Sequence, residues 1–160
     1  MKRLLPFLLL GLLAACTNPP RQPVVTCLDF HTFKPGEPVK GKQWIDRFTI
    51  EANAKPLEFR DAGAAGGPSG TIGLLIKDHV FVGIDDPYTQ FEITYVSNST
   101  VPIRFETYDQ AANILDRKTF ATDPLHTALN VSLQEAKPTK LLGFYEGGGE
   151  GLLTKVCFVH

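Results

Sequence analysis

Hydrophobic and polar residues alternate with a period of two along most of the chain. The alternation is clear at 91–95, 101–106 and 129–134, where every second residue is apolar. Because successive side chains of a β-strand point to opposite faces, each run predicts a strand with one apolar and one polar face. Further strands are predicted at 24–30, 44–52, 71–76, 80–84, 141–145 and 152–159. The final run is apolar on both faces, which is typical of a strand covered on each side.

Turn-forming residues separate these runs and set the fold class. Lys77–Asp78–His79 predicts a tight hairpin turn, 85–87 a loop, and 97–100 and 147–151 further turns. Residues 108–118 permit either one helical turn or a hairpin with its tip at 109–113. About nine short strands with this spacing predict an all-β fold, an antiparallel β-sandwich of the jelly-roll kind or a barrel, of which we favour the sandwich.

The first sixteen residues follow a different pattern. Lys2 and Arg3 precede an apolar run at 4–13, which ends in Leu13-Ala14-Ala15-Cys16. As a helix the run is about 15 Å long, half the thickness of a bilayer core, so it predicts a signal peptide rather than a membrane span. The motif resembles the lipobox of bacterial lipoproteins. That resemblance implies cleavage before Cys16, a diacylglyceryl thioether on its sulfur and a palmitate-type acyl chain on the new amino terminus.

The resemblance divides the chain into a signal peptide at 1–15, a lipidated cysteine and proline-rich tether at 16–23, and a β-domain at 24–160. Several acyl chains anchor a protein firmly to a membrane. Thr17 stands where an aspartate would resemble an inner-membrane retention signal, so we expect the outer membrane of a bacterial envelope, on its periplasmic side. The alternative is an ordinary secreted protein, cut at the end of the same leader.

Charge and loop composition exclude two classes of partner. The 160 residues hold 16 Lys and Arg against 17 Asp and Glu, a formal charge of −1. Without a basic excess, the chain cannot displace the counterions of a nucleic acid by charge. The glycine-rich run 147–151 lacks the Lys-Ser/Thr pair of a phosphate-binding loop, which argues against nucleotides. We therefore expect neither nucleic acid nor nucleotide as a partner.

Two cysteines remain after Cys16. Cys27 lies near the start of the β-domain and Cys157 near its end. An oxidising envelope permits a disulfide between them, which would hold the first strand beside the last. Two buried, unpaired thiols are the alternative.

The same two ends carry a resemblance in fold. Cys27-Leu28-Asp29-Phe30 and Val156-Cys157-Phe158 resemble the opening and closing segments of galactose-binding-like, jelly-roll sandwiches. That resemblance implies paired end strands and a structural calcium ion near the opening strand. Asp29 is the candidate calcium ligand near that strand. From the residues alone, Asp85 and Asp86 could supply loop oxygens to calcium together with Asp29 or Asp61, and the alternative is that they cap the turn before Pro87. Lys155, in the closing strand, does not fit the acidic pattern, and we expect no other cofactor.

No arrangement of residues predicts catalysis. Gly67-Pro68-Ser69-Gly70-Thr71 misses the Gly-x-Ser-x-Gly motif of serine hydrolases at its last position. The four histidines lack metal-ligand spacing, and the paired carboxylates at Asp85-Asp86 point to opposite faces of a strand. We therefore expect a protein that is not an enzyme.

Tyrosines near predicted loops indicate a binding function instead. Sugar rings stack on aromatic side chains while Asp, Asn or Gln hold their hydroxyl groups. The candidate ligand-binding residues are Asp86, Tyr88, Gln90, Tyr108 and Asp109. Trp44, by contrast, falls on the apolar stripe of its predicted strand and is expected in the core, and Tyr145 is a further aromatic residue near a loop.

The sequence thus predicts a lipid-anchored, non-catalytic envelope protein whose sandwich binds a glycan or the cell wall. The alternative is a protein-interaction, scaffold or enzyme-inhibitor lipoprotein of the envelope. Both need only an anchor, a tether, a disulfide and a set of exposed loops.

Overall fold

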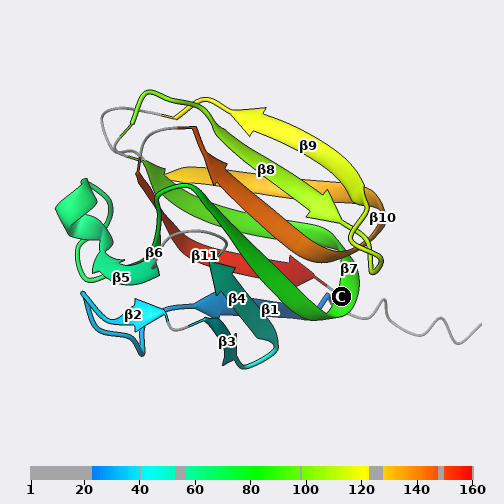
Figure 1. The fold of residues 1–160 in the computed structure, drawn as a ribbon, viewed down its shortest axis with the longest axis horizontal. Coiled ribbons are helices and arrows are strands. Elements are labelled where there is room, and N and C mark those ends of the chain that lie inside the picture. Colours follow the sequence, from blue (N-terminus) through cyan, green and yellow to red (C-terminus); the bar gives the residue numbers. More distant parts are fainter. Residues whose placement is uncertain are drawn as a thin grey trace, which may run out of the picture.

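The computed structural model describes residues 23–39, 41–52, 57–97, 99–122, 128–147 and 150–159. Within these residues the chain forms eleven strands and one short 3₁₀-helix (Figure 1). The elements are β1 (Val25–Asp29), β2 (Pro38–Val39), β3 (Lys42–Ile45), β4 (Phe48–Ala52), β5 (Leu57–Asp61), η1 (Ala62–Ala65), β6 (Ile72–Ile76), β7 (His79–Ser97), β8 (Ile103–Tyr108), β9 (Ile114–Phe120), β10 (Leu129–Glu146) and β11 (Gly151–Val159). In this part of the chain no helix is long and apolar enough to cross a bilayer.

Two long strands, β7 and β10, divide one hydrogen-bonded sheet into two layers (Figure 1). Residues 79–83 of β7 pair with 141–145 of β10, and residues 90–95 of β7 pair with 129–134 of β10. Between these two stretches β10 shifts its register on both sides of Thr139. Such irregularities bend a strand sharply, so both strands pass from one layer into the other at this point.

The pairing of the remaining strands then defines each layer. Layer A runs β3–β4–β7–β10–β8–β9 and uses the first half of β7 and the second half of β10. Layer B runs β10–β7–β11 with the other halves, and the free edge of β11 carries β1 at one end and β6–β5–β2 at the other. All pairs are antiparallel. The prediction of an all-β antiparallel sandwich is confirmed.

The core lies between the two layers and is built by the predicted alternation. Layer A buries Phe48, Val82 and Phe144, and layer B buries Ile93 and Phe158, all at 1% exposure or less. Each large apolar side chain removed from water in this way contributes about 1.5–3 kcal/mol before the entropic costs of folding. One polar pair lies among them, because the Tyr95 hydroxyl donates to the Glu146 carboxylate. Burial raises the pKa of that carboxyl group.

The first and last strands are joined as predicted. β1 pairs with β11 in a register that sets Cys27 opposite Cys157. The two form a disulfide, with their α-carbons 4.0 Å apart. The bridge lies on the outer side of layer B and closes most of the domain into one loop.

Three local predictions are wrong. The run 44–52 is a hairpin rather than one strand, because Asp46 adopts a φ of 49° and the chain turns back at Asp46-Arg47. Lys77–His79 does not close a hairpin, because β6 belongs to layer B whereas β7 begins in layer A. Residues 85–87 are not a loop but the bend inside β7.

Other predictions on the loops had different outcomes. Residues 109–113 form the tip of the β8–β9 hairpin, so the hairpin alternative for 108–118 is confirmed. The strands β2 and β5 were not predicted. The predicted signal peptide and nearly all of the predicted tether, including Cys16, lie outside the described residues.

Candidate functional site

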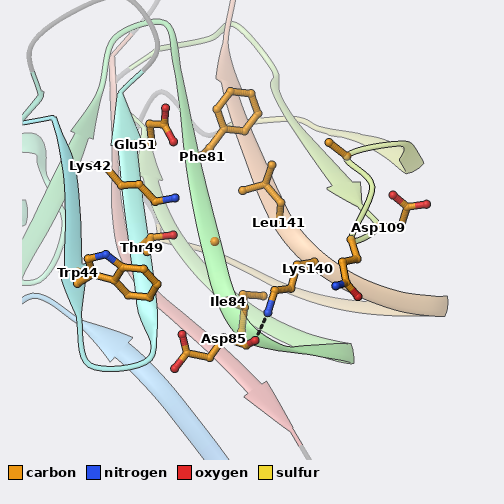
Figure 2. A pocket seen from close by; sticks show the side chains of 13 residues that line it. Lys42, Trp44, Thr49, Glu51, Phe81, Ile84, Asp85, Asp109, Lys140 and Leu141 are labelled. Atoms are coloured by element: carbon orange, nitrogen blue, oxygen red, sulfur yellow. Dashed lines mark hydrogen bonds between the residues drawn. The ribbon is translucent and has the colours of Figure 1, made fainter.

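The outer face of layer A holds a groove of about 360 Å³ (Figure 2). Neighbouring strands contribute in-register residues to it, because Trp44 lies opposite Thr49, Thr49 opposite Gly83, and Gly83 opposite Leu141. The groove is lined by Lys42, Trp44, Thr49, Glu51, Phe81, Gly83, Ile84, Asp85, Asp109, Gln110, Ala112, Lys140 and Leu141. Its size lies at the lower end of the range of small-molecule sites.

The floor of the groove is low because Gly83 has no side chain at its centre. A Cβ atom at Gly83 would collide with Oγ1 of Thr49, and Leu141 is the next side chain at 3.8 Å. The β3–β4 hairpin forms one wall and the tip of the β8–β9 hairpin forms the other (Figure 2). The hollow therefore lies between the two hairpins, over a floor in which the Thr49 side chain covers Gly83.

Trp44 is the most exposed large hydrophobic residue of the described chain, at 64% exposure. The turn at Asp46-Arg47 reverses the strand, so Trp44 pairs with the outward-facing Thr49 instead of following the buried Phe48. The expectation that Trp44 belongs to the core is therefore wrong. The ammonium group of Lys42 lies 5.9 Å from the centre of the indole ring, a cation–π distance.

Arg47 fixes the hairpin that carries Trp44. Its guanidinium group donates to the Asp86 carboxylate at 2.5 Å and to the Tyr88 hydroxyl at 3.0 Å. It also lies 4.0 Å from the Asp85 carboxylate and 5.5 Å from the centre of the Phe158 ring. The wall of the groove is thus tied to the bend of β7.

The opposite wall is held by Asp109. Its carboxylate accepts hydrogen bonds from the backbone of Ala111 and Asn113 and from the Asn113 side chain. The hydrogen bond from the Asn113 side chain is the largest cause that lowers the pKa of Asp109, and the backbone hydrogen bonds lower it further. Asp109 is therefore occupied with the loop, while Gln110 and Ala112 line the groove.

Next to the groove, the same face is filled around Gly143 rather than hollow. A Cβ atom at Gly143 would lie 2.9 Å from Tyr145, 3.2 Å from Tyr108 and 3.3 Å from Phe81, because the three rings cover this glycine. The Tyr108 hydroxyl is a donor to the Glu106 carboxylate and lies 2.8 Å from the Tyr145 hydroxyl. Burial is the main cause that raises the pKa of both tyrosines.

The structure does not gather the five predicted ligand-binding residues into one site. Tyr88 is only 9% exposed and stacks on Phe158 with ring centres 3.9 Å apart. Tyr108 is also buried, and Gln90 lies on layer B opposite Val159. Asp109 lines the groove and Asp86 binds Arg47 of the adjacent hairpin, so both carboxylates are engaged as described above. The expectation that Tyr88 and Tyr108 lie in exposed loops is therefore wrong.

Residues that sequence reasoning missed make up most of the groove. Phe81 and Leu141 are apolar residues at outward positions of their strands, and Gly83 follows Phe81 on the same face. An apolar residue on the polar face of a predicted strand, next to a glycine, was the signal that could have found them.

The candidate calcium ligands lie in different layers. Asp29 is on β1, and its carboxylate forms a hydrogen bond with His31. This hydrogen bond is the main cause that lowers the pKa of Asp29. Asp85 lies at the bend of β7 near Arg47. Among the described residues, no three Asp, Glu, His or Cys side chains gather as a metal site would require. Ser69 lies in the turn after η1, where Asp61 accepts from the N–H groups of Gly63 and Gly70.

Comparisons with known proteins relate the chain to others through its fold. No protein-family model and no curated protein match it. Among solved structures, the K2 cleaved adhesin domain of Lys-gingipain aligns with a TM-score of 0.57 at 9% identity, over 84% of this chain and 99% of that one. The K1 adhesin domain of Lys-gingipain from Porphyromonas gingivalis W83 aligns at 0.56 and 8% identity, over 86% and 98%. A mutant of a family 29 carbohydrate binding module aligns at 0.50 and 7% identity, over 86% and 92%. The chain therefore has the same kind of β-sandwich fold as these adhesin and carbohydrate-binding domains.

Proposed function

We propose that this protein is a non-catalytic glycan-binding module and that the groove on layer A is its binding site. The observation that carries the proposal is the indole ring of Trp44, exposed by 64% in the wall of a groove of about 360 Å³. An exposed indole costs free energy in water unless a ligand covers it, and its flat face suits the apolar face of a sugar ring.

The other lining residues fit the hydroxyl groups of a sugar. Lys42 and Lys140 offer donors, and Glu51 and Asp85 offer acceptors (Figure 2). Lys140 already donates to the backbone carbonyl of Asp85, which holds its ammonium group in place at the end of the groove. A few oriented polar groups around an apolar surface are the usual composition of a small-ligand site.

The structural neighbours support the proposal at the level of fold. One is a carbohydrate binding module and two are adhesin domains, according to their names. Since the same architecture serves many functions, the groove and its residues, not the fold, carry the argument.

We also propose that the leader resembling a lipobox anchors this domain to a bacterial envelope membrane through Cys16. Incorporation of labelled palmitate into the wild-type protein, and its loss in Cys16→Ala, tests this step. A wild-type protein that takes up no label would contradict the anchor without affecting the groove.

The chain contains a single tryptophan, so its fluorescence reports on the groove directly. Titration with a panel of envelope and plant oligosaccharides is expected to shift or quench Trp44 emission in a saturable way for at least one of them. Trp44→Ala should weaken binding of that sugar, measured by calorimetry, about tenfold or more, and Trp44→Phe should retain part of the affinity.

Val25→Ala provides the matched control, because Val25 is an exposed apolar residue on β1 of layer B. Its affinity should equal that of the wild type. If every sugar leaves Trp44 emission unchanged while an envelope protein binds and changes it, the protein-interaction alternative replaces the glycan proposal.

A further inference from the structure

Two arginines on the outer face of layer A share one buried carboxylate. Nε of Arg104 on β8 lies 3.0 Å from Oε1 of Glu106, and Nε of Arg117 on β9 lies 2.9 Å from the same oxygen. Glu106 is only 3% exposed, whereas the side chains of Arg104 and Arg117 are 48% and 60% exposed. The two guanidinium groups therefore lie side by side, each with one edge turned toward solvent.

This arrangement leaves one positive charge unbalanced. A single carboxylate neutralises one guanidinium group, and no other acidic side chain of the described residues lies within ion-pair distance of either arginine. Each arginine approaches Glu106 through Nε at ion-pair distance without forming a hydrogen bond, and its two Nη groups have no hydrogen-bond or ion-pair partner among the described residues. Paired N–H donors of this kind match the oxygens of a carboxylate, a sulfate or a phosphate.

Buried neighbours support part of the cluster before any ligand arrives. Oε2 of Glu106 accepts a hydrogen bond from the Tyr108 hydroxyl, whereas the buried Oε1 has no hydrogen-bond partner and lies only within ion-pair distance of the two arginines. The guanidinium group of Arg104 lies 4.5 Å from the centre of the Tyr145 ring, which supports it from below. Side chains fixed by buried partners lose little entropy when they bind, which favours a recognition site over a mere surface ion pair.

Arg104 also lines a hollow of about 330 Å³ on the same face as the groove, together with Pro102, Thr119 and Tyr145. Two acidic residues, Asp78 and Glu146, also line the hollow, and the Asp78 carboxylate lies 3.6 Å from Nδ1 of His79. The rings of Phe81 and Tyr145 separate this hollow from the groove. A saccharide of several units would extend from one to the other.

We infer that Arg104 and Arg117 bind an anionic substituent, a carboxylate, sulfate or phosphate, on the saccharide whose ring occupies the groove. This inference rests on the proposed function and deepens it by naming acidic saccharides as the ligand class. The binding involves no covalent step.

The test uses heteronuclear NMR of the Nε–H groups of Arg104 and Arg117 in the whole protein. The probes are glucuronate, the sulfate and phosphate esters of glucose, and glucose itself as the neutral match. At least one anionic sugar is expected to shift both signals in a saturable manner that weakens with added salt, and glucose is expected to leave them unchanged. The anion that shifts them most identifies the substituent.

Either arginine can be replaced without leaving Glu106 unpaired, so Arg117→Gln is expected to fold. It should weaken the response of Arg104 to the anionic sugar about tenfold, and Arg117→Lys should recover only part of the affinity, because lysine lacks the paired donors. Arg60→Gln removes the same charge from an ion pair with Glu58 and should bind as the wild type does.

The inference is overturned if no anionic sugar shifts the two signals, if glucose shifts them equally, or if Arg117→Gln and Arg60→Gln behave alike. These outcomes differ from a failure of the proposed function. If neutral glycans change Trp44 emission and no anionic sugar shifts the arginine signals, the groove remains the binding site and the anion site is contradicted. Anions that shift the arginine signals while no glycan changes Trp44 emission would leave the anion site intact and contradict the groove as the glycan site.

Discussion

The outer faces of the two layers differ in the residues at their outward positions. On layer B, the outward positions of β7, β10 and β11 hold polar residues such as Glu92, Ser132 and Lys155, as the alternation predicts. The apolar outward residues of this layer, Leu75, Val96 and Leu152, are buried under Ala62 of η1. On layer A, the outward positions include Trp44, Phe81, Leu141 and Tyr145, with glycines between them. A solvated sheet face has no need of such residues. The difference supports the proposal that the binding site lies on layer A.

The two faces also differ in what their residues do for stability. Layer B carries the Cys27–Cys157 disulfide and a Thr94–Asn130 hydrogen bond of 3.0 Å. The groove of layer A carries an exposed indole and a glycine floor, neither of which strengthens the fold. Changes on layer B should therefore affect stability alone, and changes in the groove should affect mainly binding.

The largest effect on stability is expected from the disulfide of layer B. The Cys27→Ala/Cys157→Ala variant frees a loop that spans 130 positions of sequence, which should lower the free energy of unfolding by about 2–5 kcal/mol. Denaturant titration measures this loss. Glycan affinity, measured well below the unfolding midpoint, should stay at the wild-type value, and a coupled loss of affinity would contradict the division between the faces.

The two glycines of layer A provide the next test. Gly143→Ala should destabilise the protein by about 1–3 kcal/mol, because three rings occupy the space around it. Gly83→Ala meets chiefly Thr49, so the double variant Gly83→Ala/Thr49→Ala should recover most of the stability lost by Gly83→Ala alone. Thermal unfolding of the three variants measures this. If Gly83→Ala and Gly143→Ala destabilise the protein equally, and Thr49→Ala does not restore the stability lost at Gly83, the groove floor is packed as tightly as the region around Gly143.

Glu146 lies in the core, beneath both faces, and should respond to pH. Its pKa is raised by burial, so the folded protein holds this proton to higher pH than the unfolded chain does. The stability that the protonated carboxyl supports is therefore complete at low pH and decreases as pH rises through the raised pKa. Glu146→Gln keeps the acceptor for Tyr95 and should raise the melting temperature at pH 7 by about 2–4 °C.

The gain from Glu146→Gln should shrink as pH falls below the ordinary range of a glutamate, because the wild-type carboxyl then carries its proton. Differential scanning fluorimetry across this range measures the trend. A gain that is constant with pH would contradict the assignment of the effect to the buried charge. Glycan affinity at pH 7 should not change.

The smallest effect is expected on the polar face of layer B. Asn130→Ala removes the exposed hydrogen bond to Thr94 and should change the free energy of unfolding by no more than about 0.5 kcal/mol. Calorimetric titration should give the wild-type glycan affinity. A clear loss of binding in this variant would contradict the proposed binding site on layer A.

The sequence predicted the sandwich because the alternation at 91–95 and 129–134 is a local property that survives in β7 and β10. It also predicted the Cys27–Cys157 bridge, since few cysteines leave few pairings. It could not predict that β7 and β10 each run through two layers, because the bends at 85–88 and near Thr139 depend on pairing between distant strands.

The candidate site was harder to predict than the fold. Trp44 was assigned to the core because a two-residue turn at Asp46-Arg47, without glycine, reverses which face each residue occupies. Tyr88 and Tyr108 were expected to be exposed, although their hydroxyl groups reach polar partners while their rings pack inward. In each case a tertiary contact, not a local pattern, decides whether the aromatic ring faces solvent.

We propose that the ligand lies on the outer face of layer A. The most direct measurement is NMR mapping of backbone amide shifts on titration with the glycan that most strongly changes Trp44 emission. We expect the shifts to concentrate on β3, β4, residues 79–85 of β7 and residues 140–145 of β10. Shifts concentrated on β11 and residues 129–134 of β10, with β3 and β4 unmoved, would contradict it.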